Sequence, residues 1–148
     1  MSYDQALITV AHKLNELGIK WRLFASGALY VWGVKIVPKD IDIFVTKEDI
    51  LRLEKDFAVY LTKPLHSFNE KGKEYLEFQI RISGIEIEIC EIGSLGEIVP
   101  LSFQTETVWV APLEAERDEY LRNSPFKDRL PLIDMRLKDI QSEEHTTR

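Results

Sequence analysis

Apolar residues in the first third of the chain switch between helical and extended spacing. Positions 2–17 carry a capping-box pattern followed by apolar side chains every three to four residues, which predicts an amphipathic helix. A short strand over 19–25 and a short helix over 28–32 are expected next. A loop over 35–39 then leads into a strand over 40–45, in which apolar and acidic side chains alternate.

The middle of the chain predicts one helix and one hairpin. A second capping-box pattern at 46–49 opens an apolar stripe that reaches position 61, as expected of an amphipathic helix. Residues 64–68 are a weak strand candidate. Residues 73–82 and 85–92 alternate on either side of a Ser-Gly pair, which indicates two antiparallel strands joined by a tight turn.

The C-terminal third predicts a strand over 107–110 and two helices, over 112–121 and 127–140. The polar segment 141–148 is expected to be a disordered tail. Residues 1–140 are therefore predicted to form a single α/β (α+β) domain. We expect a mixed central sheet of about five strands, flanked by helices, with the C-terminal helices packed alongside.

Composition and charge limit the classes of protein open to this chain. Its 148 residues are 45% hydrophobic and 30% charged, as in an ordinary globular domain. No apolar run approaches the ~20 residues of a membrane helix and no secretory signal pattern is present, so we expect a cytoplasmic protein without membrane contact. The single cysteine, Cys90, excludes an internal disulfide and suits a reducing compartment. The net charge of −6 argues against non-specific nucleic-acid binding.

Two carboxylates interrupt an otherwise apolar strand. Asp40 and Asp42 alternate with Ile41 and Ile43, so both side chains are expected on one face, about 6.6 Å apart along the strand. Aspartate is disfavoured in strands, and two like charges this close repel each other. A divalent cation between them would remove the repulsion, whereas the alternative is a solvated acidic face. The pattern favours a Mg²⁺ or Mn²⁺ site.

A second acidic alternation occurs in the predicted hairpin. Glu86 and Glu88 share one face, opposite three isoleucines. If this strand pairs with the Asp-Ile-Asp strand, one of the two glutamates could join the aspartates around a metal. Three carboxylates around one or two metal ions can support phosphoryl or nucleotidyl transfer. The sequence leaves open which glutamate is the third ligand.

A small-residue turn precedes the acidic strand. Ser26 and Gly27 lie between a predicted strand and a predicted helix, where unpaired backbone N–H groups and the helix dipole favour phosphate. The serine hydroxyl could add a donor, and the glycine would let the ligand approach the backbone. The alternative is a turn that uses small residues for packing alone.

These features together resemble the nucleotidyltransferase superfamily, which includes polymerase beta, kanamycin nucleotidyltransferase and the minimal nucleotidyltransferases. The family pattern is a Gly-Gly or Gly-Ser turn after the first strand, an Asp-x-Asp or Asp-x-Glu strand about a dozen residues on, and a third acid on a later strand. The corresponding residues here are Ala25-Ser26, Asp40-Ile41-Asp42 and Glu88. Segments 25–33 and 108–114 look like the abortive-infection branch of the superfamily.

The resemblance implies transfer of a nucleoside monophosphate from a nucleoside triphosphate such as ATP to an acceptor hydroxyl. It implies that Asp40, Asp42 and Glu88 bind Mg²⁺ or Mn²⁺, and that Ser26 and Gly27 hold the β and γ phosphates. Lys39 or Lys35 would then supply nearby positive charge, although either lysine could be a solvated loop cation.

The sequence leaves several questions open. The acceptor could be a small molecule, a protein or RNA, and neither the base of the nucleotide nor the oligomeric state is indicated; a homo-oligomer is compatible with Trp32, Trp109 and Phe103 as a contact surface. A rival hypothesis is a nucleotidyltransferase-fold module that binds or regulates without turnover, as part of a toxin–antitoxin pair. A third is a structural interaction domain with neither metal nor nucleotide.

Overall fold

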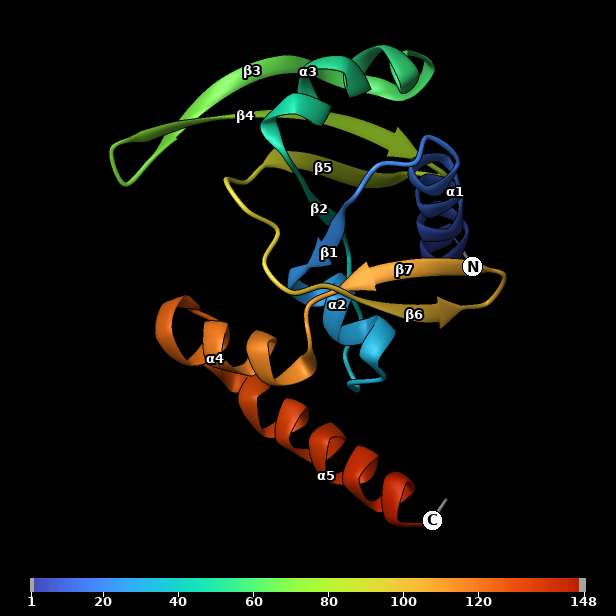
Figure 1. Cartoon of the computed structure of the whole chain (residues 1–148), viewed down its shortest axis with the longest axis vertical. Helices are drawn as coiled ribbons and strands as arrows, with labels where there is room; N and C mark the ends of the chain where they lie inside the picture. The colour runs from blue at the N-terminus through green and yellow to red at the C-terminus, as the bar shows by residue number, and fades with distance from the viewer. Residues whose placement is uncertain (1, 147–148) are drawn as a thin grey trace.

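The computed structural model describes residues 2–146, except for the side chains at positions 123, 145 and 146. Its helices are α1 (Ser2–Glu16), α2 (Ala25–Trp32), α3 (Lys47–Asp56), α4 (Leu113–Asn123) and α5 (Leu130–Thr146), with short 3₁₀ turns at Ala58–Tyr60 and Lys127–Arg129. Its strands are β1 (Arg22–Phe24), β2 (Ile41–Val45), β3 (Leu61–Glu70), β4 (Lys73–Ile82), β5 (Ile85–Glu91), β6 (Val99–Phe103) and β7 (Glu106–Val110). Both C-terminal helices lie at the opposite end of the molecule from the β3–β4 hairpin (Figure 1).

The strands in the described part of the chain form one seven-stranded sheet in the order β3-β4-β5-β2-β1-β7-β6. Pairing is parallel between β2 and β5 and between β1 and β7, and antiparallel elsewhere, so the sheet is mixed. The central strand β2 is therefore paired on both sides, with β1 and with β5. This arrangement confirms the expected mixed α/β class.

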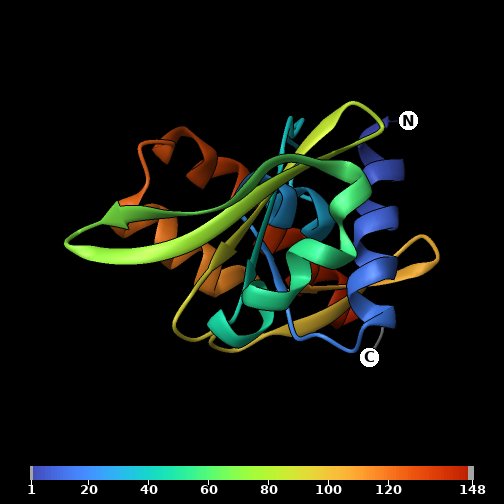
Figure 2. The same cartoon turned by 90° about the horizontal axis from the view of Figure 1, so that it is seen from above.

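The main core lies on one face of this sheet. In β2 the residues Ile41, Ile43 and Val45 are buried, whereas Asp42 and Phe44 between them are partly exposed on the other face. Helices α1 and α3 pack against the apolar face and contribute their buried side chains to the same cluster (Figure 2). The face of β2 that carries the isoleucines therefore belongs to the core, and the face that carries Asp42 is open to polar groups.

A second, smaller apolar cluster holds the C-terminal helices in place. Leu29 and Val34 from the α2 region contact Leu113 and Tyr120 of α4 and Ile133 of α5. Trp32 adds a hydrogen bond from its indole N–H to the carbonyl of Ala111, at 3.0 Å. Among the described residues no helix combines the length and apolar character that crossing a bilayer requires.

Four features differ from the sequence expectations. Helix α3 ends at Asp56, and Leu61, expected to close the apolar stripe of that helix, instead begins β3. The sheet has seven strands rather than about five, because residues 61–70 form a long strand and residues 99–103 form one that was not expected. Asp40 lies just before β2, whose ladder begins at Ile41. Helix α5 continues to Thr146, so positions 141–146 are helical where a disordered tail was expected; positions 147–148 of that tail lie outside the described residues.

Candidate active site

Asp42 occupies the centre of the polar face of the sheet. Its register partners are Phe24 on β1 and Glu88 on β5, and because side chains of directly paired residues project to the same face, the two carboxyl groups lie side by side. Burial, and after it the nearby charge of Asp40, raise the pKa of Asp42 to about 6. A carboxylate in this position is destabilised unless a cation accompanies it.

Asp40 is exposed and immediately precedes β2. Its backbone carbonyl accepts a hydrogen bond from the hydroxyl of Tyr3 in α1, at 3.0 Å. Burial raises the pKa of Tyr3 well above its usual range, and Asp42 is the next largest cause. Tyr3 therefore remains protonated at neutral pH and ties the first turn of α1 to the start of the acidic strand.

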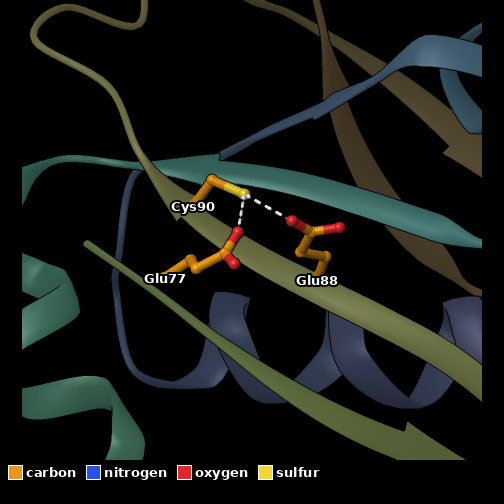
Figure 3. Close-up of side chains that lie close together, drawn as sticks. All are labelled: Glu77, Glu88 and Cys90. Atoms are coloured by element: carbon orange, nitrogen blue, oxygen red, sulfur yellow. Dashed lines mark hydrogen bonds between the residues drawn. The ribbon is translucent and has the colours of Figure 1, made fainter. Parts of the chain in front are cut away.

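Glu88 is half-buried in a polar cluster with Glu77 and Cys90 on β4 and β5, the residues whose possible ligand atoms all lie within 4.8 Å of one another. It is hydrogen-bonded to Glu77, and the Cys90 sulfur lies 3.6 Å from Glu88 Oε1 and 3.7 Å from Glu77 Oε2 (Figure 3). The bond with Glu77 and then burial raise the pKa of Glu88 to about 7. Burial also raises the pKa of the Cys90 thiol, so this group stays a neutral donor rather than a thiolate ligand.

His66 completes this cluster from β3. Its Nε2 lies 2.7 Å from Glu77 Oε1. The bond with Glu88 is the largest cause that lowers the pKa of Glu77, and the His66 contact lowers it as well. Glu77 is thus the ionised member of the pair, and Glu88 carries the shared proton. Sequence reasoning missed this arrangement, because the β3–β4 register that brings His66 opposite Glu77 has two irregularities.

Glu86 is placed differently from Glu88. It forms an ion pair with Arg81 of β4, with Nη2 and Oε1 2.9 Å apart, and both side chains are about half exposed. Glu88, in contrast, is the direct neighbour of Asp42. Of the two glutamates that the sequence left open, the structure sets Glu88 beside the aspartate and gives Glu86 a cationic partner of its own.

The turn before α2 has an unusual backbone. Ala25 has a φ of +61°, in the left-handed region that favours glycine, which gives a physical reason for the glycine that the family pattern has at this position. Ser26 is half-buried in the first turn of α2. Gly27 is buried, and a Cβ there would lie 2.9 Å from Tyr3 Oη and 3.1 Å from Leu23 Cδ1. Lys39 and Lys35 are exposed in the loop that leads to β2.

A cavity of about 500 Å³ lies next to these groups, between the β1–β2 part of the sheet and α4. Phe24 and Phe44 form one wall, with their rings stacked 3.6 Å apart at 4°. Ala25 lines the cavity as well, which connects it to the start of α2. A larger cavity of about 780 Å³ lies near Asn15 and Trp109. Asp40, Asp42 and Glu88 line neither cavity, but only the smaller one is lined by Ala25 and by Phe24, the register partner of Asp42.

The paired carboxyl groups of Asp42 and Glu88 suit a hard cation. Asp42 and Glu88 both have raised pKa values, Asp40 adds a third carboxyl at the start of β2, and a divalent ion would favour the ionised form of each. The protonated Cys90 thiol is a poor ligand for such an ion. The first turn of α2 adds unpaired backbone N–H groups, so the same end of the sheet offers both metal ligands and anion donors.

Comparison with known proteins supports the fold. No protein-family model matches this chain, and no curated protein is significantly similar to it. A Thermotoga maritima protein inferred to be a nucleotidyltransferase matches with a TM-score of 0.72 and 18% identity, over 99% of this chain and 94% of that chain. Lincomycin-bound lincosamide adenylyltransferase LnuA matches with a TM-score of 0.65 and 10% identity, over 88% of this chain and 95% of that chain. ANT(2″)-Ia in complex with adenylyl-2″-tobramycin matches with a TM-score of 0.62 and 14% identity, over 97% of this chain and 94% of that chain.

These likenesses define the class of fold, a mixed sheet with flanking helices that is shared by enzymes transferring nucleotide groups. The chain thus has the fold of the nucleotidyltransferase superfamily, as the sequence resemblance implied. Identities of 10–18% establish the fold and nothing narrower, and the three structures do not single out the abortive-infection branch.

Proposed function

We propose that this chain is a metal-dependent nucleotidyltransferase that moves a nucleoside monophosphate from a nucleoside triphosphate to an acceptor hydroxyl. The observation that carries the proposal is the direct pairing of Asp42 with Glu88, beside the first turn of α2, in a chain with this fold. In a structural domain without a ligand, two adjacent carboxyl groups that are hard to ionise would only destabilise the fold.

Asp40, Asp42 and Glu88 would hold Mg²⁺ or Mn²⁺. Such an ion neutralises phosphate charge and lowers the pKa of an attacking hydroxyl. Asp42 and Glu88 are fixed by the β2·β5 ladder, whereas Asp40 is held through the hydrogen bond from Tyr3 to its carbonyl. In this proposal Asp42 and Glu88 reach the ion from the paired strands β2 and β5, and Asp40 reaches it from the residue before β2.

The first turn of α2 would bind the β and γ phosphates. Ser26 offers a hydroxyl and a backbone N–H, and the positive end of the helix dipole points in the same direction. Gly27 is too tightly packed to leave space beside its Cα, so its contribution is a backbone N–H. Lys39 would add positive charge from the exposed loop before β2.

A small-molecule hydroxyl is one acceptor consistent with the proposal. Of the similar structures, LnuA is bound to lincomycin and ANT(2″)-Ia is in complex with adenylyl-2″-tobramycin. The net charge of −6 makes an RNA end less favourable as an acceptor, because the phosphate backbone prefers a basic surface.

Titration calorimetry with Mg²⁺ and a set of nucleoside triphosphates tests the proposal. Triphosphate binding should require the metal, and Asp42→Asn and Glu88→Gln should each abolish it while the fold is retained. Glu86→Gln is the matched control, because it removes a charge from the same strand at a residue paired with Arg81. Wild-type levels of binding in both Asp42→Asn and Glu88→Gln would remove these carboxylates from the site.

Pyrophosphate release separates an enzyme from a binding module. Release that depends on an acceptor would support transfer. Metal-dependent binding without pyrophosphate from any acceptor tried would instead favour the non-catalytic nucleotidyltransferase-fold module, for which the strained Ala25 in place of glycine is the structural argument.

A further inference from the structure

The cavity between α4 and the β1–β2 part of the sheet contains two buried polar groups without partners. Glu116 of α4 is only 5% exposed, and its Oε1 has no hydrogen-bond partner among the described residues. Nε of Arg22 on β1 is also buried and has no hydrogen-bond partner among the described residues. Nη1 of the same side chain donates to the carbonyl of Leu95 at 2.9 Å. Both side chains line the cavity. Buried polar groups are almost always hydrogen-bonded, so an unpaired acceptor and an unpaired donor on one cavity point to a ligand that pairs with both.

The electrostatics of Glu116 agree with this interpretation. Burial raises its pKa to about 7, while the charge of Arg22 acts in the opposite direction. A ligand that donates hydrogen bonds to the carboxylate would favour its ionised form, because hydrogen bonds to charged groups are stronger than those between neutral groups.

The remaining walls fit a flat aromatic ligand. Phe24 and Phe44 are stacked on the sheet side. On the helix side Arg129 donates to the Tyr120 hydroxyl at 3.0 Å, and its guanidinium lies 4.4 Å from the ring centre of Phe126. The cavity volume of about 500 Å³ is within the range of small-molecule sites. Ala25 at its edge adjoins the turn proposed for the phosphates, so a nucleotide can place its phosphates there and its base in the cavity.

The donor and acceptor pattern of the walls matches one base better than the others. Guanine presents a carbonyl oxygen, O6, beside two N–H donors, on N1 and N2. The two oxygens of Glu116 can accept both donors, and the guanidinium of Arg22 can donate to O6. Adenine offers a single donor, N6–H, on the same edge, and hypoxanthine lacks the 2-amino group.

We propose that this cavity binds the base of the nucleoside triphosphate and that Glu116, together with Arg22, selects guanine. The inference rests on the proposed nucleotidyl transfer, since it names the triphosphate that the site would take. Glu116 thereby acts as a specificity-determining residue, distinct from the carboxylates proposed to hold the metal.

Calorimetric titration of GTP, ITP and ATP in MgCl₂ tests this assignment. Wild-type protein should bind GTP roughly 10- to 100-fold more tightly than ITP, because ITP lacks the 2-amino donor to a charged acceptor. Glu116→Gln replaces one acceptor by a donor and should lower GTP affinity by a similar factor, so that GTP and ITP bind alike. Glu114→Gln, an exposed position in the same helix, is the matched control and should keep the wild-type preference.

The outcomes separate the two proposals. Equal affinity of the wild-type protein for the three triphosphates, or a preference for ATP, would overturn the guanine assignment. If Asp42→Asn still abolished that binding, nucleotidyl transfer would stand. Absence of metal-dependent binding for every triphosphate would overturn the proposed function, and the guanine assignment with it. The comparison of GTP with ITP uses wild-type protein, so it remains decisive even if Glu116→Gln fails to fold.

Discussion

The hydroxyl of Tyr3 donates a hydrogen bond to the backbone carbonyl of Asp40, which lies 37 positions further along the chain. The same hydroxyl is the nearest atom to the space that a Cβ at Gly27 would occupy. One tyrosine thus connects the first turn of α1, the first turn of α2 and the residue that precedes the acidic strand. It positions two of the segments proposed to bind metal and phosphate.

Tyr3→Phe should reduce the free energy of unfolding by about 0.5–1.5 kcal/mol, because one hydrogen bond is lost without a change of shape. The change also removes the link that holds Asp40, so metal affinity should fall in the same variant. Urea denaturation and Mg²⁺ titration measure the two effects. Unchanged stability together with unchanged metal binding would show that the bond to Asp40 does not position the site.

Gly27→Ala should destabilise the protein by roughly 1–3 kcal/mol, since the added methyl would overlap Tyr3 Oη and Leu23 Cδ1 in a packed interior. Gly93→Ala is the matched control, because no atom lies within 4 Å of the Cβ position there. Thermal unfolding of the two variants checks the difference. Equal melting temperatures would contradict the close packing of α2 against Tyr3.

Ala25→Gly should stabilise the protein by up to about 1 kcal/mol, because glycine adopts a φ of +61° without the steric cost that alanine has there. Ala28→Gly, in the buried part of the same helix, should have the opposite effect, since glycine lowers helix stability by about 1 kcal/mol. Denaturant midpoints of the two variants provide the test. A loss of stability in Ala25→Gly would mean that the left-handed backbone is not strained.

The stabilisation contributed by Asp42 and Glu88 should fall as pH rises when no divalent metal is bound. The folded-state pKa of Asp42, about 6, and that of Glu88, about 7, lie above the ordinary values of 3.8 and 4.5. The folded protein therefore holds protons that the unfolded chain releases. The resulting stabilisation is complete below about pH 4 and is lost as the pH rises through 6 and 7.

Asp42→Asn should remove part of this pH dependence. At pH 8 in EDTA the variant is expected to be more stable than wild type, by on the order of 2 kcal/mol, and the difference should shrink toward pH 4. Adding Mg²⁺ at pH 8 should raise the melting temperature of the wild type and leave the variant unaffected. A variant less stable than wild type at pH 8 would show that the carboxylate is not under electrostatic strain.

The sequence predicted the parts of the site that depend on local pattern. Alternation placed Asp42 on the face opposite the isoleucines, and it placed Glu86 and Glu88 together on another strand. It could not choose between the two glutamates, because that choice depends on the register between β2 and β5, two strands far apart in the sequence. The ion pair that Arg81 makes with Glu86 likewise follows from the hairpin register.

Features that depend on tertiary packing were the ones that the sequence did not reveal. Strand β6 contains Pro100 and lies at the edge of the sheet, so its partly exposed side chains give only a weak alternating pattern. Glu116 belongs to a helix rich in charged residues and has the sequence signature of a solvated face. Its burial results from the packing of α4 against Arg22 and the sheet.

The central place of β2 has a consequence for how the site responds to thermal fluctuation. Asp42–Phe44 are paired on both edges, with β1 and with β5, so their amide protons should exchange slowly with deuterium. The amide of Asp40, just outside the ladder, should exchange far sooner. One of the two aspartates is thus held in a strand that is paired on both edges, while its neighbour lies outside the ladder, where it can adjust to an incoming ion.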